Sequence, residues 1–252
     1  MKKRLGLLLG VALCVATRAG AASTEQQSKE GERLEKSTFV INEIMRQPDN
    51  GIPQDLLNRA VCVGIVPGEK KLAFVFGGNY GRGALICRRG GDGAWGAPSM
   101  FTVGGGSWGL QIGGESTDIV FIVMNMDGVR KLLEHGIKLG ADASVAAGPV
   151  GRTSSAATDV QMHAEILSYS RARGLFAGLS LAGALLKQDD DGNHRLYGRY
   201  ITPEEILIEG KVEPPGSARS LDQILTQYSP HGGSSFGKSE PVHRQEGAKK
   251  GV

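Results

Sequence analysis

The sequence is poor in aromatic residues and cysteines, and no apolar run is long enough for a permanent transmembrane helix. Phe, Tyr and Trp make up 6% of the 252 residues, and only three residues are cysteines. Glycine is abundant at 38 residues and proline contributes 10, yet together they stay below the roughly 25–30% typical of low-complexity chains. Composition therefore excludes a collagen-like rod, a mainly disordered chain and a polytopic membrane protein, and the length suits one domain.

The first 22 residues have the pattern of a secretory signal peptide. A basic segment (residues 2–4) precedes an apolar stretch (residues 5–16), and Ala19-Gly20-Ala21 supplies the small residues of a cleavage site. We expect cleavage near residue 22 and a periplasmic or secreted product that associates peripherally with a membrane. Lipoprotein anchoring at Cys14 is disfavoured, because a leucine precedes that cysteine.

Loss of the signal peptide changes the net charge and the number of cysteines. Residues 1–22 contain four basic residues and no acidic one, so the formal charge falls from +3 to −1. Nucleic-acid binding needs a basic surplus, so we expect no nucleic-acid partner. The two remaining cysteines, Cys62 and Cys87, form either one disulfide or two buried thiols on neighbouring strands, and the sequence leaves both open.

Residues 23–228 are expected to form one α+β domain, a curled and mainly antiparallel sheet with flanking helices. Short apolar runs separated by glycines, without helical crossovers, predict strands at 61–66, 72–76, 83–87, 101–103, 108–112 and 118–124. Helices are predicted at 24–47, at 127–135 with Asp127 as N-cap, at 206–209 behind a capping box, and at 221–228. Residues 67–71 are expected to form a tight turn, and residues 78–83 a glycine-rich hairpin. Residues 229–252 are expected to be a disordered tail.

Motifs for catalysis and metal binding are incomplete. Residues 105–109 fit the G-x-S-x-G pattern around Ser107, but a nucleophile elbow requires a helix after the serine, and residues 110–114 favour a strand. Asp189, Asp191 and Asn193 begin like a calcium loop that lacks its glycine and closing glutamate, which favours a polar hairpin tip. We therefore expect neither an enzyme nor a metal site nor a cofactor, with a serine hydrolase using Ser107 as the third hypothesis.

Residues 175–186 are the most apolar stretch after the signal peptide and carry no charge. One interpretation is a central core strand with a face of small residues. The alternative is a segment that inserts into a membrane. Twelve residues are too few to span the hydrocarbon, which favours the core strand.

Five motifs in order resemble those of the SYLF domain family. They are PDNGIP (residues 48–53), GGNYGRG (77–83), QIGG (111–114), AAGPVGR (146–152) and YSRARGLFAG (169–178). Together they cover about residues 30–228. The resemblance implies a non-catalytic lipid-binding protein, since eukaryotic relatives bind phosphoinositides and some yeast relatives also bind actin filaments. Because of the export signal, we expect anionic phospholipid headgroups as ligands and do not expect actin as a partner.

A basic stripe on the predicted first helix is the candidate lipid contact. Lys29, Arg33 and Lys36 share one helical face, next to interleaved glutamates and separate from an apolar stripe of Leu34, Ile41 and Met45. The family resemblance implies that an N-terminal amphipathic stretch contributes to lipid binding. Further candidates are Lys70 and Lys71 in the expected turn. The rival hypothesis is a structural module that binds an envelope protein.

Overall fold

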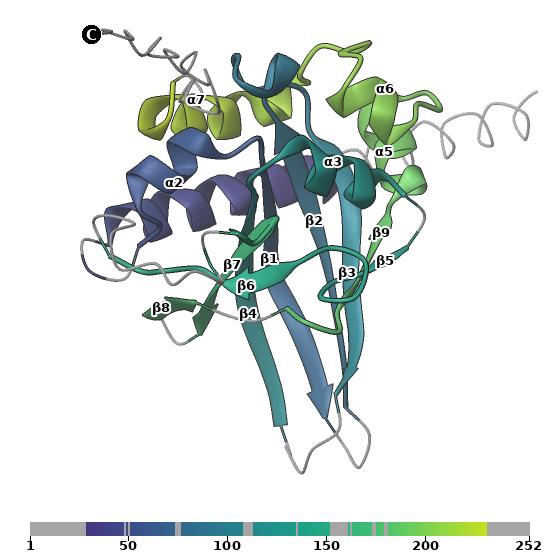
Figure 1. The fold of residues 1–252 in the computed structure, drawn as a ribbon. Coiled ribbons are helices and arrows are strands. Elements are labelled where there is room, and N and C mark those ends of the chain that lie inside the picture. The colour runs from purple at the N-terminus through teal and green to yellow at the C-terminus, as the bar shows by residue number, and fades with distance from the viewer. Residues whose placement is uncertain are drawn as a thin grey trace, which may run out of the picture.

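Among the described residues of the computed structural model, nine strands form one curled sheet (Figure 1). The structure describes residues 29–47, 49, 51–73, 77–107, 113–134, 136–151, 161, 163–172, 175–178 and 181–230. The predicted signal peptide, the strand predicted at 108–112 and residues 231–252 of the predicted tail lie outside these described residues. The expected α+β class, with a mainly antiparallel sheet and flanking helices, is confirmed.

Four long strands form the centre of the sheet: β1 (Cys62–Ala73), β2 (Gly77–Cys87), β3 (Ser99–Ser107) and β4 (Gly113–Val123). The shorter strands are β5 (Ile137–Lys138), β6 (Val145–Ala147), β7 (Ile166–Ala172), β8 (Leu175–Gly178) and β9 (Leu185–Gln188). Their order is β5-β9-β3-β2-β1-β4-β7-β6, with β8 paired to β7. All of these pairs are antiparallel except β6–β7.

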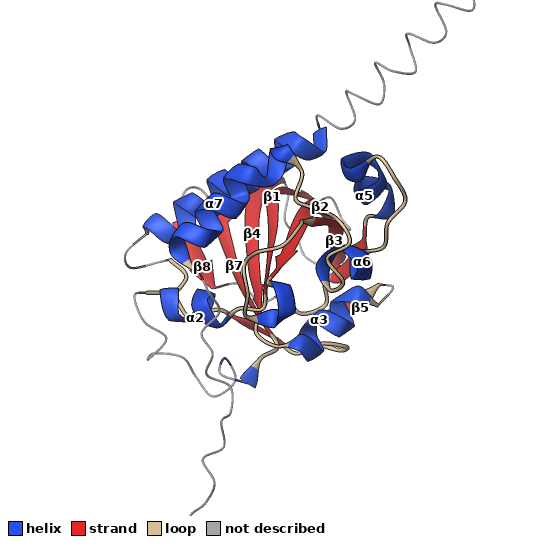
Figure 2. Ribbon diagram, turned by 90° about the horizontal axis from the view of Figure 1, so that it is seen from above, coloured by secondary structure: helices blue, strands red, loops and turns tan. Residues whose placement is uncertain are grey.

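Helices cover both faces of the sheet, so the sheet has an apolar cluster on each side (Figure 2). On one face pack the N-terminal helix (residues 29–46), α2 (Gln54–Arg59) and α7 (Arg219–Tyr228). On the other face pack α3 (Met126–Leu133) and α6 (Pro203–Leu207). Residues along β4 alternate between the two clusters, which explains why both sets of its side chains are apolar.

The apolar stripe of the N-terminal helix is buried as predicted. Leu34 and Ile41 are fully buried, and Met45 packs at the edge of the same cluster. The capping box before α6 is also confirmed, because Thr202 and Glu205 exchange hydrogen bonds between side chain and backbone. These elements depend on residues a few positions apart, and local patterns predicted them correctly.

Glycine is required at two strand positions, Gly64 and Gly83, because neighbouring atoms pack too closely for a Cβ atom, and not because the chain turns there. A Cβ atom on Gly64 would lie 2.1 Å from the ring of Phe121, and one on Gly83 would lie 2.6 Å from the ring of Phe101. The two rings pack edge to face with centroids 5.4 Å apart. The predicted hairpin at residues 78–83 is therefore wrong, since these glycines belong to the length of β2.

The tight turn predicted at residues 67–71 is also wrong. Strand β1 runs through this segment, and its pairing with β4 shifts register between Val66 and Glu69. The backbone amide of Gly68, at φ 67°, donates a 2.9 Å hydrogen bond to Oδ1 of Asp118 on β4. A bulge therefore accommodates the proline and glycine within one strand.

Two further predictions around α5 (Asp190–Tyr197) need correction. The expected hairpin tip at 189–193 is the start of this helix, with Asp189 as N-cap and Gly198 in the left-handed conformation after the last turn.

The run 175–186 is not one strand, because β8 and β9 are separate and Gly183 makes a turn between them at φ 88°. No helix among the described residues is long and apolar enough to cross a membrane. In α3, the N-cap is Asn125 rather than Asp127.

The first residue of the predicted tail belongs to the fold. Ser229 is fully buried after α7, and its backbone oxygen accepts hydrogen bonds from Arg88 and Trp95. The guanidinium of Arg88 stacks 3.9 Å from the centre of the Trp95 ring. The buried guanidinium thus anchors the end of α7 to the sheet.

A basic groove beside the N-terminal helix

An open groove of about 800 Å³ lies between the N-terminal helix and strands β1, β2, β4 and β7. Five cationic side chains line it: Lys29, Arg33 and Lys36 from the helix, Arg82 from β2 and Arg171 from β7. Two carboxylates, Glu32 and Asp118, also line it. The groove therefore combines the predicted basic stripe with cations from distant parts of the sequence.

The three stripe residues have different surroundings. Lys36 is 61% exposed and forms a 2.7 Å ion pair with Glu32 one turn earlier, which lowers the pKa of Glu32. Lys29 is exposed. Arg33, in contrast, is only 15% exposed and pairs with Glu30, whose side chain is 1% exposed. Arg33 is therefore largely buried and differs from the two exposed lysines of the stripe.

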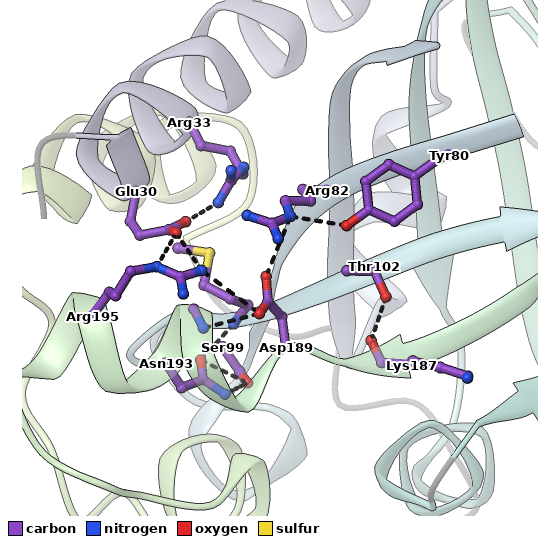
Figure 3. Close-up of polar contacts among 12 residues, drawn as sticks. Glu30, Arg33, Tyr80, Arg82, Ser99, Thr102, Lys187, Asp189, Asn193 and Arg195 are labelled. Atoms are coloured by element: carbon purple, nitrogen blue, oxygen red, sulfur yellow. Dashed lines mark hydrogen bonds and ion pairs between the residues drawn. The ribbon is translucent and has the colours of Figure 1, made fainter. Parts of the chain in front are cut away.

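Arg33 belongs to a partly buried cluster of charged residues that joins three elements (Figure 3). We call Glu30, Arg33, Arg82, Asp189 and Arg195 the arginine cluster. Arg195 of α5 lies 3.0 Å from Glu30 and 3.7 Å from Asp189, and Arg82 lies 3.8 Å from Asp189. Because a buried carboxylate is costly without a cationic partner, these pairs connect the N-terminal helix to α5 and β2.

Positive charge is in surplus within the arginine cluster, where three guanidinium groups face two carboxylates. Burial and the neighbouring charges of Arg82 and Arg195 lower the pKa of Arg33. For Arg82 the balance is opposite, since its hydrogen bond to the Tyr80 hydroxyl, at 2.9 Å, and the charge of Asp189 raise its pKa. Of these two residues, Arg33 is therefore the one whose charged form the surroundings disfavour.

The other end of the groove is closer to neutral. Arg171 lies 2.8 Å from Asp118 and 3.6 Å from Glu43, and its guanidinium lies 5.2 Å from the centre of the Phe39 ring. Phe39 is 54% exposed and Tyr80, on the strand side, is 52% exposed. Two half-exposed aromatic rings thus accompany the cations.

The remaining predicted site residues lie elsewhere or cannot be placed fully. Lys70 and Lys71 belong to β1 and pair with Tyr80 and Asn79 of β2, but their side chains lie outside the described part of the structure. Cys62 and Cys87 are direct cross-strand neighbours, buried and joined in a disulfide. Among the described residues, no group of His, Cys, Asp and Glu could hold a metal ion.

Ser107 is the last residue of β3, and its strand neighbour is Gly77. The next described element is strand β4, which begins at Gly113. Residues 108–112, which would have to begin the helix of a nucleophile elbow, lie outside the described residues.

The sequence patterns identified the stripe but missed Arg82, Arg171 and the partners of Arg33. Arg82 and Arg171 lie within the motifs GGNYGRG and YSRARGLFAG, a signal that could have identified them. Glu30 and Arg195 are 165 positions apart, and no local pattern links them.

Comparisons with known proteins identify relatives over most of the chain. Residues 104–228 match the family Ysc84, described as "Las17-binding protein actin regulator". The chain is 34% identical to LAS seventeen-binding protein 3 of Saccharomyces cerevisiae over 206 residues, which cover 81% of this chain and 44% of the relative. It is 38% identical to an SH3 domain-containing protein of Schizosaccharomyces pombe, covering 69% of this chain and 40% of the relative. The rat SH3 domain-containing YSC84-like protein 1 is 32% identical, with coverages of 72% and 53%.

The Saccharomyces cerevisiae relative is named as a binding protein, and the other two are named for an SH3 domain. The chain spans about half of the length of these relatives or less. The expectation that actin is not a partner is overturned, because the family itself is described as an actin regulator. The ordered motifs, the matched fold region and the relatives agree with one another. The chain therefore belongs to the SYLF (Ysc84) domain family.

Proposed function

We propose that this domain is a non-catalytic binding module whose ligand is the surface of an anionic phospholipid membrane. The observation that carries the proposal is the groove, where cations from one helix and two strands meet two half-exposed aromatic rings. Multiply charged basic surfaces with adjacent aromatic side chains suit a membrane interface, where charge attracts and rings insert.

The energetics support a contact of moderate strength. Each basic residue near an anionic bilayer contributes about 1 kcal/mol, and Lys29 and Lys36 are both exposed. Glu32 and Asp118 offset part of this attraction. Insertion of Phe39 adds an apolar contribution, since burying such a ring gives roughly 1.5–3 kcal/mol.

Vesicle co-sedimentation tests the proposal. We expect pelleting with phosphatidylglycerol vesicles, little with neutral phosphatidylcholine, and weakening as salt rises. The double variant Lys29→Gln/Lys36→Gln should bind anionic vesicles about tenfold more weakly. Arg33 is left unchanged, because reversing or removing its charge would disturb the buried Glu30.

The matched control removes two exposed cations on the opposite face of the sheet. Arg130→Gln/Lys138→Gln changes α3 and β5, which belong to the other apolar cluster, and should bind like the parent. Equal binding by the parent and the groove variant, with both folded, would exclude the groove as the lipid contact.

The names of the relatives favour a second candidate function, binding to an actin-regulating protein. Co-sedimentation with actin filaments and capture with a Las17-type protein, each in the absence of lipid, test it. Specific retention that the groove variant keeps, together with no vesicle binding, would favour this second candidate over the first.

We also propose that the protein is exported and processed near residue 22. The basic and apolar segments with Ala19-Gly20-Ala21 support export, and a disulfide between Cys62 and Cys87 suits an oxidising compartment. Intact-mass measurement of protein from its native host tests this. Retention of Met1, or a lipid adduct on Cys14, would overturn it.

A further inference from the structure

The disulfide between Cys62 and Cys87 lies where three central strands end. Cys62 is the first residue of β1, and Cys87 is the last residue of β2. Val123, which pairs with Cys62 from the other side, is the last residue of β4. Backbone hydrogen bonds at the ends of elements open more readily than those in the middle of a sheet. The disulfide therefore joins β1 and β2 at the point where their pairing would separate first.

The residue that follows Cys87 holds the ends of two helices. Arg88 is 2% exposed, and its guanidinium donates one hydrogen bond to the backbone oxygen of Ala60, the residue after α2. It also donates to the backbone oxygen and the hydroxyl of Ser229, the residue after α7. The backbone amide of Arg88 donates a 2.8 Å hydrogen bond to the oxygen of Val61, which precedes the other cysteine. The position of the guanidinium thus depends on the strand pairing next to the disulfide.

The disulfide and the guanidinium serve different faces of the sheet (Figure 2). The two cysteines belong to the apolar cluster on the face of α3 and α6. Trp95, which stacks on Arg88, belongs to the cluster on the face of α7. Reduction keeps both sulfur atoms in their cluster and removes only the bond between them, so the packing on their own face changes little. It frees the backbones of the two strand ends, on which the contacts of Arg88 depend.

We propose that the Cys62–Cys87 disulfide is a redox-controlled lock on the C-terminal end of α7, which a dithiol reductant opens. In the oxidised protein the bond fixes the strand ends, and Arg88 holds Ser229 against the sheet. In the reduced protein the strand ends separate locally, and the end of α7 loses this hold. The lock is independent of the proposed lipid contact, since it concerns α7 and not the groove.

The chemistry of the lock is thiol–disulfide exchange. One thiolate of the reductant attacks a sulfur of the disulfide, and the S–S bond breaks to give a mixed disulfide and one cysteine thiolate. The second thiolate of the reductant then attacks the mixed disulfide and releases the other cysteine. Both cysteine thiolates take up protons, and the reductant leaves as its own disulfide. Cys62 is 0% exposed and Cys87 3%, so the attack requires a local opening of the strand ends.

The first experiment measures whether the disulfide can be reduced in the folded protein. The full chain is treated with dithiothreitol at several urea concentrations below the unfolding transition, and free thiols are counted over time. We expect the reduction rate to rise with urea much less steeply than the unfolding equilibrium constant, because a local opening exposes less surface. A rate that follows global unfolding, or no reduction below the transition, would overturn the lock.

The second experiment locates the change by hydrogen exchange of the oxidised and the reduced full chain. We expect residues 219–230 to exchange at least about tenfold faster after reduction, and residues 126–133 of α3 to change less than about threefold. The control Leu132→Ala keeps the disulfide and removes a buried side chain from the face of α3, so it should accelerate α3 rather than α7. Equal acceleration of the two helices on reduction would make the disulfide a general stabilising bond and overturn the lock.

A variant of Arg88 tests whether this residue transmits the effect. Arg88→Gln removes the donors to Ala60 and Ser229, so residues 219–230 should exchange rapidly even in the oxidised protein and reduction should add less than about twofold. A further tenfold rise on reduction would contradict the role of Arg88.

A second variant covers the case in which Arg88→Gln does not fold. Ser229→Ala keeps the backbone oxygen that accepts from Arg88 and Trp95 and loses only the hydroxyl. In the oxidised state its α7 should exchange several times faster than that of the parent and more slowly than that of the reduced parent. A folded Ser229→Ala protein with the exchange of the oxidised parent would refute the hold on α7.

Discussion

Removal of Arg195 is the sharpest test of the arginine cluster. In Arg195→Gln, Glu30 loses a partner 3.0 Å away and Asp189 loses one 3.7 Å away. Glu30 is 1% exposed and Asp189 8%, so water cannot replace the lost cation. Breaking a buried ion pair from one side typically costs 3–5 kcal/mol. Because Arg33 and Arg82 remain beside the two carboxylates, we expect the lower end, about 3 kcal/mol of unfolding free energy.

Urea unfolding followed by circular dichroism measures this loss, with amide hydrogen exchange over residues 29–46 as a second readout. The exchange of the N-terminal helix should accelerate more than that of β1–β4, since the cluster joins this helix to α5 and β2. Arg130→Gln is the control, because its pair with Asp127 is 70% and 74% exposed and should contribute less than about 1 kcal/mol. A loss in Arg195→Gln no larger than in this control would refute the role of the cluster.

Three further predictions concern other parts of the fold. Gly64→Ala should destabilise the protein by at least about 2 kcal/mol in urea unfolding, because its Cβ would lie 2.1 Å from the Phe121 ring; a neutral effect would contradict the packing. Reduction of the Cys62–Cys87 disulfide, which closes a loop across 25 positions, should lower stability by about 3 kcal/mol, with a double alanine variant as the control insensitive to reductant. A hydrogen bond from the backbone amide of Thr202, and second in importance one from Lys211, lowers the pKa of Glu205 from 4.5 to about 2. The stabilisation of α6 by Glu205 is therefore complete above pH 4.5 and lost as the pH falls toward 2. An NMR titration of Glu205 with an inflection near pH 4.5 would disprove this.

Local patterns were sufficient for the elements whose stability depends on neighbours in sequence. The apolar stripe at Leu34 and Ile41 predicted the buried face of the N-terminal helix, since helical periodicity places these residues together. The capping box at Thr202 and Glu205 predicted the start of α6 for the same reason, because both partners lie within one turn. A short apolar run at residues 118–124 likewise predicted the second half of β4.

Tertiary contacts decided the elements and the site residues that depend on distant partners. The local sequence around Pro67 and Gly68 predicts a turn. In the fold, Asp118, 50 positions away, accepts a hydrogen bond from the Gly68 amide, and β1 continues through this segment. The helical pattern predicts Arg33 as one of three basic residues on a common face. In the fold Arg33 is largely buried and pairs with Glu30, to which Arg195 also pairs. Sequence alone determined which charges the helix carries along one face. Only the packing of that helix against β2 and α5 determined which of them remain exposed and which form part of a buried cluster, because burial and ion pairing depend on residues brought together by the whole fold.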